Sequence, residues 1–470
     1  MTQHLLAGIG RSDITPPVGI AHINWGARTH DRAEGIDLPL WATVLALKSG
    51  DVTTAIVDLD FLLIPTADCL MLRDVVAEAV GTARANVRLS FTHTHSGPPW
   101  NPDGMGGQAS LPGMEMVPAY RDKFVASLRA AAWAARADLK PARVAADLGA
   151  SDVSVNRRLR LPEGRTVVAQ NWDGITDPTM TVIRIDDLDE NPIATIVGYG
   201  THPIVMAHLN KLVSPDYPGT VKRVVEQLVG GTCLFLQGCA GDQIPREAIT
   251  GDHETARRMG RLIGVDAARV ALRLHTRPTR RRFDGVVESG APLGIWTEEP
   301  AAEEPMRLAV VSRMVALPVR DYGPPDALAA EAAKRHAAVN ALDKKTATPK
   351  QIAEANYLAK RAAMNAKWAQ VCKGRTTFEV ELQAIRIGPA ALVGVPLEPF
   401  AAIGQAIREA SPLRVTQFAG YTNGWDGYVP TDNEFQFGGY ETEWATPYDK
   451  GAADVLIKAS TETLRGLANG

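Results

Sequence analysis

The stretch Phe91-Thr92-His93-Thr94-His95-Ser96-Gly97-Pro98 decides how the rest of the chain is interpreted. It follows residues 86–90, which are typical of a short strand. If the strand continued through this stretch, His93 and His95 would lie on one face at the end of the strand. Neutral imidazoles bind zinc-like metals, and the following glycine allows another group to approach closely. The alternative is a histidine pair that only hydrogen-bonds to backbone, because short motifs often match by chance.

The segments around this stretch predict an α/β fold. Residues 53–61 form an apolar, β-branched run, and residues 67–84 carry apolar residues at helical spacing. With the strand before His93 they give a strand–helix–strand unit, which binds ligands beyond the carboxyl ends of its strands. The Gly-, Pro- and Met-rich residues 100–117 are expected to form a loop over the site.

Residues 324–370 differ from the rest because they are alanine-rich, charged and helical in pattern. They predict an inserted antiparallel helical hairpin, whose second helix starts at Thr348-Pro349. Its basic residues are interpreted as a solvated helix face, with an oligomer contact as the alternative: Lys344, Lys345, Lys360 and Arg361. No repeat or flexible linker interrupts the chain. We therefore predict one α/β domain over residues 1–470, with mixed β-sheets flanked by helices.

Composition restricts the class of function. Hydrophobic residues are 45%, charged residues 22% and the net charge −3, which gives no electrostatic case for nucleic acid or an anionic membrane. Four cysteines without a CxxC pair argue against a disulfide framework or a cysteine-rich zinc site. No apolar run is long enough to span a bilayer, and the first residues do not form a signal peptide. The expectation is a cytoplasmic protein without a membrane span.

Two other strand ends carry candidate metal ligands. His202 follows the predicted strand 192–199, and Glu398, between two prolines, follows the strand 390–395. With His93 they form two histidines and a carboxylate, the ligand set of many catalytic zinc sites. Spacing along the chain does not prove that they converge. The alternative for Glu398 is an exposed helix-start residue favoured by the helix dipole.

A series of motifs follows in a fixed order along the chain: Gly8-Ile9-Gly10-Arg11-Ser12-Asp13-Ile14-Thr15, Thr92-His93-Thr94-His95-Ser96-Gly97-Pro98, Asn156-Arg157, Thr201-His202-Pro203, Ser214-Pro215-Asp216, Ala240-Gly241-Asp242, Pro396-Leu397-Glu398-Pro399, Tyr428-Val429-Pro430-Thr431 and Tyr440-Glu441. In their residue types and in their order along the chain, these motifs resemble those of the neutral/alkaline (non-lysosomal) ceramidase family. The resemblance spans almost the whole chain and implies the fold of that family's catalytic domain.

The resemblance implies a zinc ion (Zn2+) held by two histidines, a glutamate and a tyrosine, which fall on His93, His202, Glu398 and Tyr428. It also implies that His95, Arg157 and Tyr440 line the reaction centre. Metal-bound water would attack an amide carbonyl, with Arg157 and Tyr440 at the oxyanion and His95 moving a proton to the amine. Asp242 is expected to support a ligand histidine from behind.

The sequence departs from the family in three places. Ile244 stands where the family's Gly-Asp-Val-Ser-Pro element has serine. A mechanism or substrate contact that depends on the serine hydroxyl therefore does not apply to this chain. The family's ceramidases are secreted or membrane-exposed and have a C-terminal β-sandwich domain, which we do not expect here. The segment 324–370 matches no family motif. These departures favour a smaller, soluble amide over long-chain ceramide.

The leading hypothesis is a zinc-dependent amidohydrolase that cleaves a small linear or cyclic carboxamide, N-acyl amides included. A zinc-dependent esterase or lactonase is the first alternative. A catalytically silent metal- or ligand-binding protein on the same scaffold is the second. The aromatic residues in 422–448 suggest a pocket for a partly apolar group, or else they pack a large loop. The sequence leaves open the substrate, the choice of amide or ester, and whether the chain forms a homo-oligomer.

Overall fold

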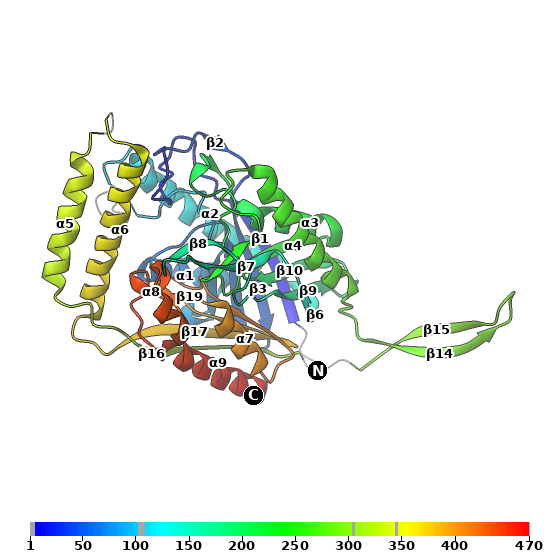
Figure 1. Cartoon of the computed structure of the whole chain (residues 1–470). Coiled ribbons are helices and arrows are strands. Elements are labelled where there is room, and N and C mark those ends of the chain that lie inside the picture. Colours follow the sequence, from blue (N-terminus) through cyan, green and yellow to red (C-terminus); the bar gives the residue numbers. More distant parts are fainter. Residues whose placement is uncertain (1–4, 102–108, 303–305, 344–345, 470) are drawn as a thin grey trace.

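Two β-sheets packed face to face form the centre of the molecule, and helices cover their outer faces (Figure 1). The computed structural model describes residues 5–101, 109–302, 306–343 and 346–469. The larger sheet has the strand order β12-β10-β9-β6-β1-β3-β4-β5 and the smaller one β16-β17-β18-β20. Aliphatic side chains of both sheets meet between them, among them Ile183 and Leu234 from the larger and Ile385 and Leu392 from the smaller. The mixed α/β architecture predicted from the sequence is confirmed.

The bounds of the elements are as follows. The larger sheet consists of β1 (Leu5–Asp13), β3 (Trp41–Ser49), β4 (Val52–Leu59), β5 (Val87–Phe91), β6 (Lys140–Ala150), β9 (Thr179–Asp187), β10 (Pro192–Tyr199) and β12 (Thr232–Gln237). The smaller consists of β16 (Leu308–Pro318), β17 (Thr377–Ile387), β18 (Ala390–Gly394) and β20 (Val415–Ala419). Short strands pair at the site side: β2 (Gly35–Ile36) with β11 (Leu212–Val213), β13 (Gln243–Pro245) with β7 (Ser154–Arg160), β7 with β8 (Thr166–Asn171), and β19 (Glu398–Pro399) with β21 (Tyr428–Val429).

Helices pack on the outer faces of both sheets because each presents one apolar face. The larger sheet is covered by α1 (Thr66–Val80), α2 (Val117–Ala137), α3 (Asp216–Val229) and α4 (His253–Arg273). The smaller is covered by α7 (Ala401–Glu409) and α9 (Ala452–Asn469), while α8 (Tyr440–Glu443) is a single turn beside β21. A Cβ on Gly10 of β1 would collide with the carbonyl oxygen of Ala131, so this glycine lets α2 approach the strand closely.

The strand–helix–strand unit at the start of the chain is confirmed. β4 and β5 pair in parallel, with Asp58 opposite Ser90 and Leu59 opposite Phe91, and α1 connects them. β10 and β12 form a second parallel pair. β4 and β5 run opposite to β10 and β12, because five antiparallel pairings separate β4 from β10. The ends of β5 and β12 nevertheless meet, since Gln237 Nε2 donates to Thr92 O at 3.4 Å. Of the loop predicted over 100–117, residues 102–108 lie outside the described part.

The predicted helical hairpin is confirmed as α5 (Pro325–Ala341) and α6 (Pro349–Cys372), which lie side by side at one end of the molecule (Figure 1). Thr348 caps α6 as the Thr-Pro start predicts: its hydroxyl accepts from Gln351 N, and the Gln351 side chain accepts from Thr348 N. Lys344 and Lys345 of the predicted solvated face lie outside the described residues. The role expected for Lys360 is wrong, as shown below.

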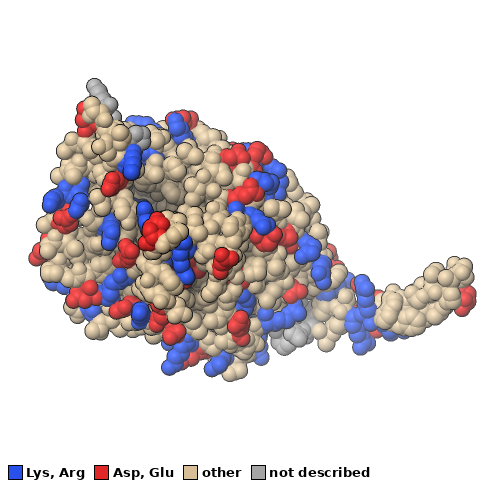
Figure 2. Space-filling model, in the orientation of Figure 1, with Lys and Arg blue, Asp and Glu red and all other residues tan. Residues whose placement is uncertain are grey.

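A two-stranded arm, β14 (Thr279–Val287) and β15 (Leu293–Pro300), projects from the body (Figures 1 and 2). Its strands pair only with each other, and Phe283 and Trp296 are 49% and 63% exposed. No helix within the described ranges combines the length and the apolar character needed to cross a bilayer. The single-domain organisation and the oligomeric state stay predictions.

Candidate metal and catalytic site

His93 stands just beyond β5 in an unusual backbone conformation. Its φ is 67°, in the left-handed region that a non-glycine residue seldom adopts. Its backbone N donates to Phe61 O at 3.0 Å, and its Nδ1 lies 2.8 Å from Leu62 O. The prediction that strand geometry continues to His95 is therefore wrong. Backbone strain of this kind is typical of functional sites.

His202 follows β10 and meets His93 edge to face. Its Nδ1 lies 2.7 Å from Ala240 O, and the two Nε2 atoms are 3.1 Å apart. A carbonyl oxygen only accepts, so each Nδ1 carries the proton and each Nε2 presents a lone pair. Two lone pairs at this distance repel each other unless a cation lies between or beside them. The convergence of His93 and His202, which spacing could not establish, is thus present in the structure.

Glu398 brings a carboxylate to the same place. Its Oε2 lies 3.7 Å from His93 Nε2 and 3.5 Å from His202 Nε2. The backbone of Gly241 explains this approach, because its N donates to Pro399 O at 3.0 Å and a Cβ would lie 2.5 Å from Glu398 O. Glu398 is 2% exposed, so the alternative of an exposed helix-start glutamate is wrong.

His95 completes a histidine triad. The candidate ligand atoms of His93, His95 and His202 lie within 4.8 Å of one another. Neither nitrogen of His95 has a hydrogen-bond partner among the described residues. The ring packs against Trp25, with the centroids 5.0 Å apart. Metal-ligating histidines usually donate their second nitrogen to a carbonyl or carboxylate, as His93 and His202 do. His95 lacks such a contact, which suits a proton carrier better than a ligand.

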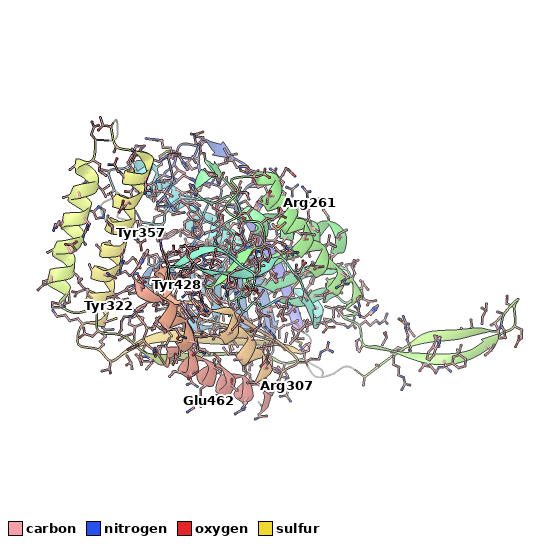
Figure 3. All side chains as sticks on the ribbon, viewed as in Figure 1. Arg261, Arg307, Tyr322, Tyr357, Tyr428 and Glu462 are labelled. Atoms are coloured by element: carbon pink, nitrogen blue, oxygen red, sulfur yellow. The ribbon has the colours of Figure 1, made fainter. Side chains whose placement is uncertain are left out.

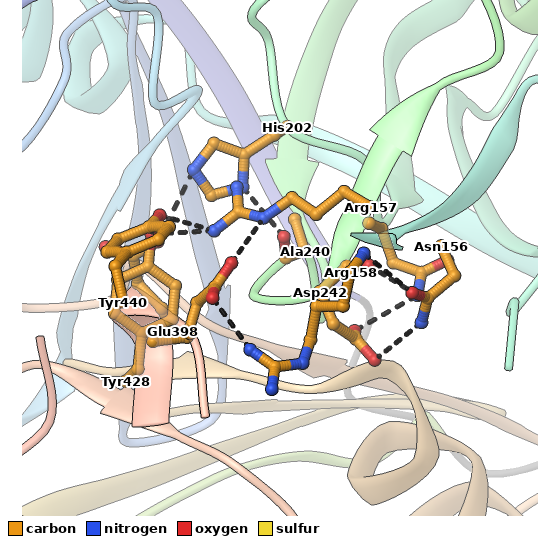
Figure 4. A network of polar contacts seen from close by, with 12 residues as sticks. Asn156, Arg157, Arg158, His202, Ala240, Asp242, Glu398, Tyr428 and Tyr440 are labelled. Carbon is orange, nitrogen blue, oxygen red and sulfur yellow. Dashed lines mark hydrogen bonds and ion pairs between the residues drawn. The ribbon is translucent and has the colours of Figure 1, made fainter. Parts of the chain in front are cut away.

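Arg157 and two tyrosines form the opposite wall of the site (Figure 4). Arg157 Nη2 donates to Tyr428 OH at 3.1 Å and lies 2.5 Å from Tyr440 OH, and the two hydroxyls are 2.7 Å apart. Tyr428 is in register with Glu398 across the parallel pair β19–β21. Glu441 anchors Arg157 through Nε at 3.1 Å. Arg157, Tyr428 and Glu441 are buried and Tyr440 is half-buried, so the segment that carries Arg157 is not a solvated turn.

Asp242 does not contact a histidine, contrary to the prediction that it supports one. Its Oδ1 accepts from Ala401 N at 2.8 Å, and its Oδ2 accepts from Asn156 Nδ2 at 3.3 Å. Its carbonyl accepts from Arg157 N at 2.8 Å. The predicted supporting contact is made instead by the carbonyls of Leu62 and Ala240. Asp242 therefore joins the strand that carries Arg157 to the helix that follows Glu398.

A cavity of about 400 Å3 lies on the far side of Asp242, lined by Asn156, Leu159, Arg160, Asn171, Asp173, Gly174, Ile175, Asp242, Ala402, Thr431 and Glu434. It does not include the histidines. Ile244, which replaces the family's serine, is fully buried against Val155 and Ile204. No hydroxyl is therefore available at this position.

Burial controls the charge of the site. It lowers the pKa of His93 and lowers those of His95 and His202 well below the usual value, with neighbouring cations such as Arg157 adding to the effect. The imidazoles are therefore neutral near pH 7, the form that binds a metal. Burial and the charge of Glu398 raise the pKa of Tyr428 well above its usual value. A bound cation would oppose this shift, because it favours the phenolate.

Three residues of the site were missed from the sequence as functional groups. Trp425 Nε1 donates to Glu398 Oε1 at 2.6 Å, and Tyr421 OH donates to Oε2 at 3.1 Å. Glu441 bridges Arg157 and Arg158, with the latter contact at 2.7 Å. Tyr421 has a positive φ of 51°. The glycine-containing run that follows it after β20 is the sequence signal that could have indicated a turn at this strand end. Glu441 follows Tyr440 in the motif already noted.

Comparison with known proteins shows the family to which the chain belongs. The family model of the neutral/alkaline non-lysosomal ceramidase, N-terminal, matches residues 5–240, about half of the chain. The chain therefore belongs to the neutral/alkaline non-lysosomal ceramidase family, and the resemblance seen in the motifs is confirmed.

Particular relatives extend this result. Neutral ceramidase B of Dictyostelium discoideum is 31% identical over 215 residues, which cover 41% of this chain and 29% of that protein. Neutral ceramidase A of the same organism is 31% identical over 154 residues, 31% of this chain and 20% of that protein. The matched parts thus span less than a third of either relative.

Solved structures show the same fold over nearly the whole chain. The neutral ceramidase from Pseudomonas aeruginosa superimposes with a TM-score of 0.66 at 22% identity, covering 99% of this chain and 75% of that one. A ceramidase complexed with C2 gives a TM-score of 0.64 at 21% identity, with 99% and 76% covered. At this identity the likeness establishes the fold.

Proposed function

We propose that this protein is a zinc-dependent amidohydrolase that cleaves a small carboxamide, N-acyl amides included. The observation that carries the proposal is the pair of unprotonated Nε2 atoms of His93 and His202, 3.1 Å apart, beside Oε2 of Glu398. Family membership supports amide hydrolysis, because the relatives are ceramidases and ceramide is an N-acyl amide.

The residues present fit a zinc ion. Two neutral imidazoles and a carboxylate are borderline ligands of the kind zinc prefers, and Tyr428 is the proposed fourth ligand. Both imidazoles are held through Nδ1 by carbonyls, and Trp425 holds the carboxylate, as expected for oriented metal ligands. Zinc, when bound, supplies Lewis acidity to the amide carbonyl and to the attacking water.

Arg157 and Tyr440 are proposed to bind the carbonyl oxygen as it becomes an oxyanion. Arg157 Nη2 and the Tyr440 hydroxyl converge within 2.5 Å, so both can donate to one acceptor. Glu441 and the β7 backbone hold the guanidinium before substrate arrives. This preorganisation means that the donors need not move during the reaction.

His95 is proposed to move the proton to the departing amine. Its two nitrogens are unpartnered within the described chain, and its ring centroid is 4.9 Å from that of His93. Water adds hydroxyl to the acyl carbon while the C–N bond breaks, and the amine nitrogen gains a proton. A neutral imidazole can accept that proton from water and deliver it to nitrogen.

The pocket wall favours a substrate with an apolar part. Tyr428 packs with Met364, Trp368, Phe400 and Trp444, and Trp425 and Tyr440 pack against this group. The aromatic stretch packs its loop, and we propose that its face toward the site also receives the apolar part of the substrate. Ester hydrolysis at the same site stays an alternative, since esters are attacked more easily than amides.

The test is a panel of matched amides and esters, assayed before and after removal of metal with a chelator and after restoring zinc. We expect amide hydrolysis that chelation abolishes and zinc restores. His93→Ala should lose zinc and activity together, whereas His275→Ala, at an exposed position, should keep both. Turnover by metal-free protein contradicts the zinc mechanism, and bound zinc without any turnover indicates a silent scaffold.

A further inference from the structure

One face of α6 lines the site. The Tyr357 ring lies 6.0 Å from that of Trp444, and Met364 and Trp368 pack in the apolar group that contains Tyr428. Figure 3 shows Tyr357 on the side of α6 that faces the body of the protein, where Tyr428 lies. These positions recur at helical spacing, so they form one stripe along the helix. The hairpin thus contributes a wall of the site.

Lys360 belongs to the same stripe. It stands one turn after Tyr357 and one turn before Met364, so it lies on the face of α6 that packs against the body of the protein, and it is half-buried there. Burial lowers the pKa of Lys360, Arg28 adds to this effect, and Glu398 opposes it. Lys360 in turn contributes to the lowered pKa of His95. The interpretation of Lys360 as part of a solvated face is therefore wrong.

Lys360 has no ion-pair partner in the part of the chain that the structure describes. Among the described residues, none forms a hydrogen bond or an ion pair with its ammonium group, although Arg361 beside it faces Glu443. Arg28, which acts on Lys360 electrostatically, pairs with Asp31 at 3.3 Å and donates to Trp25 O at 2.9 Å, and its Nε is left without a partner within the described ranges. An unpaired ammonium near a second cation is unfavourable unless an anion joins it.

The surroundings contain further donors without acceptors. Trp25 Nε1, Arg28 Nε and both nitrogens of His95 have no partner in the described chain, although they are buried. Buried donors of this kind normally meet a ligand, water or ion. The face in Figure 2 is hollowed between the hairpin and the body, so a small ligand has access from outside.

We propose that the site takes an amide that carries a carboxylate, bound by Lys360 together with Arg28, as in an N-acyl amino acid. This inference rests on the proposed hydrolase function and adds the substrate class. The carboxylate accepts from the Lys360 ammonium and from the unpartnered Nε of Arg28, while the acyl group packs against the aromatic wall that holds Trp425 and Trp444. The inserted hairpin then determines specificity, since it supplies Lys360.

The test compares N-hexanoylglycine with N-hexanoylethanolamine, which has a neutral hydroxyl in place of the carboxylate. We expect wild type to prefer N-hexanoylglycine in kcat/KM. Lys360→Met should reduce this preference about tenfold or more, mainly through KM, because a charge-assisted hydrogen bond contributes on that scale. Lys360→Arg should keep most of it. Lys350→Met, exposed on the same helix, is the matched control and should keep the wild-type ratio.

The inference is overturned if Lys360→Met has the same ratio of kcat/KM values for the two amides as wild type. It is also overturned if wild type does not prefer N-hexanoylglycine. Calorimetry separates this failure from failure of the hydrolase proposal. If neither amide is cleaved, the hydrolase proposal fails. Binding of N-hexanoylglycine that is about tenfold weaker in Lys360→Met than in wild type still supports the carboxylate site. Equal binding by both proteins, or none, overturns it.

Discussion

Trp425 Nε1 donates a hydrogen bond of 2.6 Å to Oε1 of Glu398. Because Tyr421 OH donates to the other oxygen at 3.1 Å, the carboxylate cannot rotate without losing a partner. Oε2 is thereby kept beside the Nε2 atoms of His93 and His202. The position of one candidate ligand thus depends on residues that never touch the metal themselves, and this dependence can be measured.

Trp425→Phe removes the donor and keeps most of the aromatic contact. We expect zinc affinity to fall about tenfold to a hundredfold, since removing a group that orients a metal ligand has effects of this size. Competition with a chromophoric chelator measures the affinity. Trp172→Phe, at a position that is 63% exposed, is the control and should bind zinc as wild type does. Equal affinity in Trp425→Phe and wild type contradicts the proposed role.

Tyr440→Phe removes one of the two donors at the proposed oxyanion position. We expect kcat to fall about a hundredfold with zinc content retained, because such a donor acts mainly in the transition state. Steady-state kinetics and metal analysis of the same preparation give both quantities. An unchanged kcat would remove Tyr440 from the reaction centre, and loss of zinc would mean that its hydroxyl acts on the ligands instead.

Asp216 predicts a pH dependence of the free energy of unfolding. Burial raises its pKa to about 6, against hydrogen bonds from Tyr217 N and Met206 N that favour the charged form. The folded state then binds the proton more tightly than the unfolded state. This contribution to stability is present below about pH 4 and is lost as pH rises through about 6.

Asp216→Asn should remove this dependence, and asparagine tolerates the positive φ of 55° at this position. The free energy of unfolding of wild type, relative to the variant, should fall by on the order of 2 to 3 kcal/mol between about pH 4 and pH 7. Urea unfolding at several pH values measures the difference. A difference that is constant or rises with pH contradicts the raised pKa.

The strand ends that carry His93 and His202 were predictable, because each follows a strand with clear apolar character. The meeting of Glu398 and Tyr428 was not predictable from pattern. It depends on two-residue strands, β19 and β21, which have no periodicity to detect. Family motifs supplied these residues where local propensity could not.

Long-range pairs explain the remaining errors. The burial of Arg157 and Arg158 could not be predicted from their local sequence, because their partner Glu441 lies far along the chain. Lys360 resembled a solvated residue because helical spacing shows the faces of a helix but not what covers each face. Asp242 was expected to support a histidine. The backbone carbonyls of Leu62 and Ala240 contact the histidine Nδ1 atoms instead, and no sequence pattern identifies such carbonyls.

The central claim is that His93, His202, Glu398 and Tyr428 bind one zinc ion. Crystals of the zinc-loaded protein, measured on both sides of the zinc absorption edge, test it most directly. The account predicts a single strong anomalous peak within about 2.3 Å of His93 Nε2, His202 Nε2 and a Glu398 oxygen, the bonding distance for zinc. A zinc-loaded crystal without a peak at these atoms, or with the peak elsewhere, would contradict it.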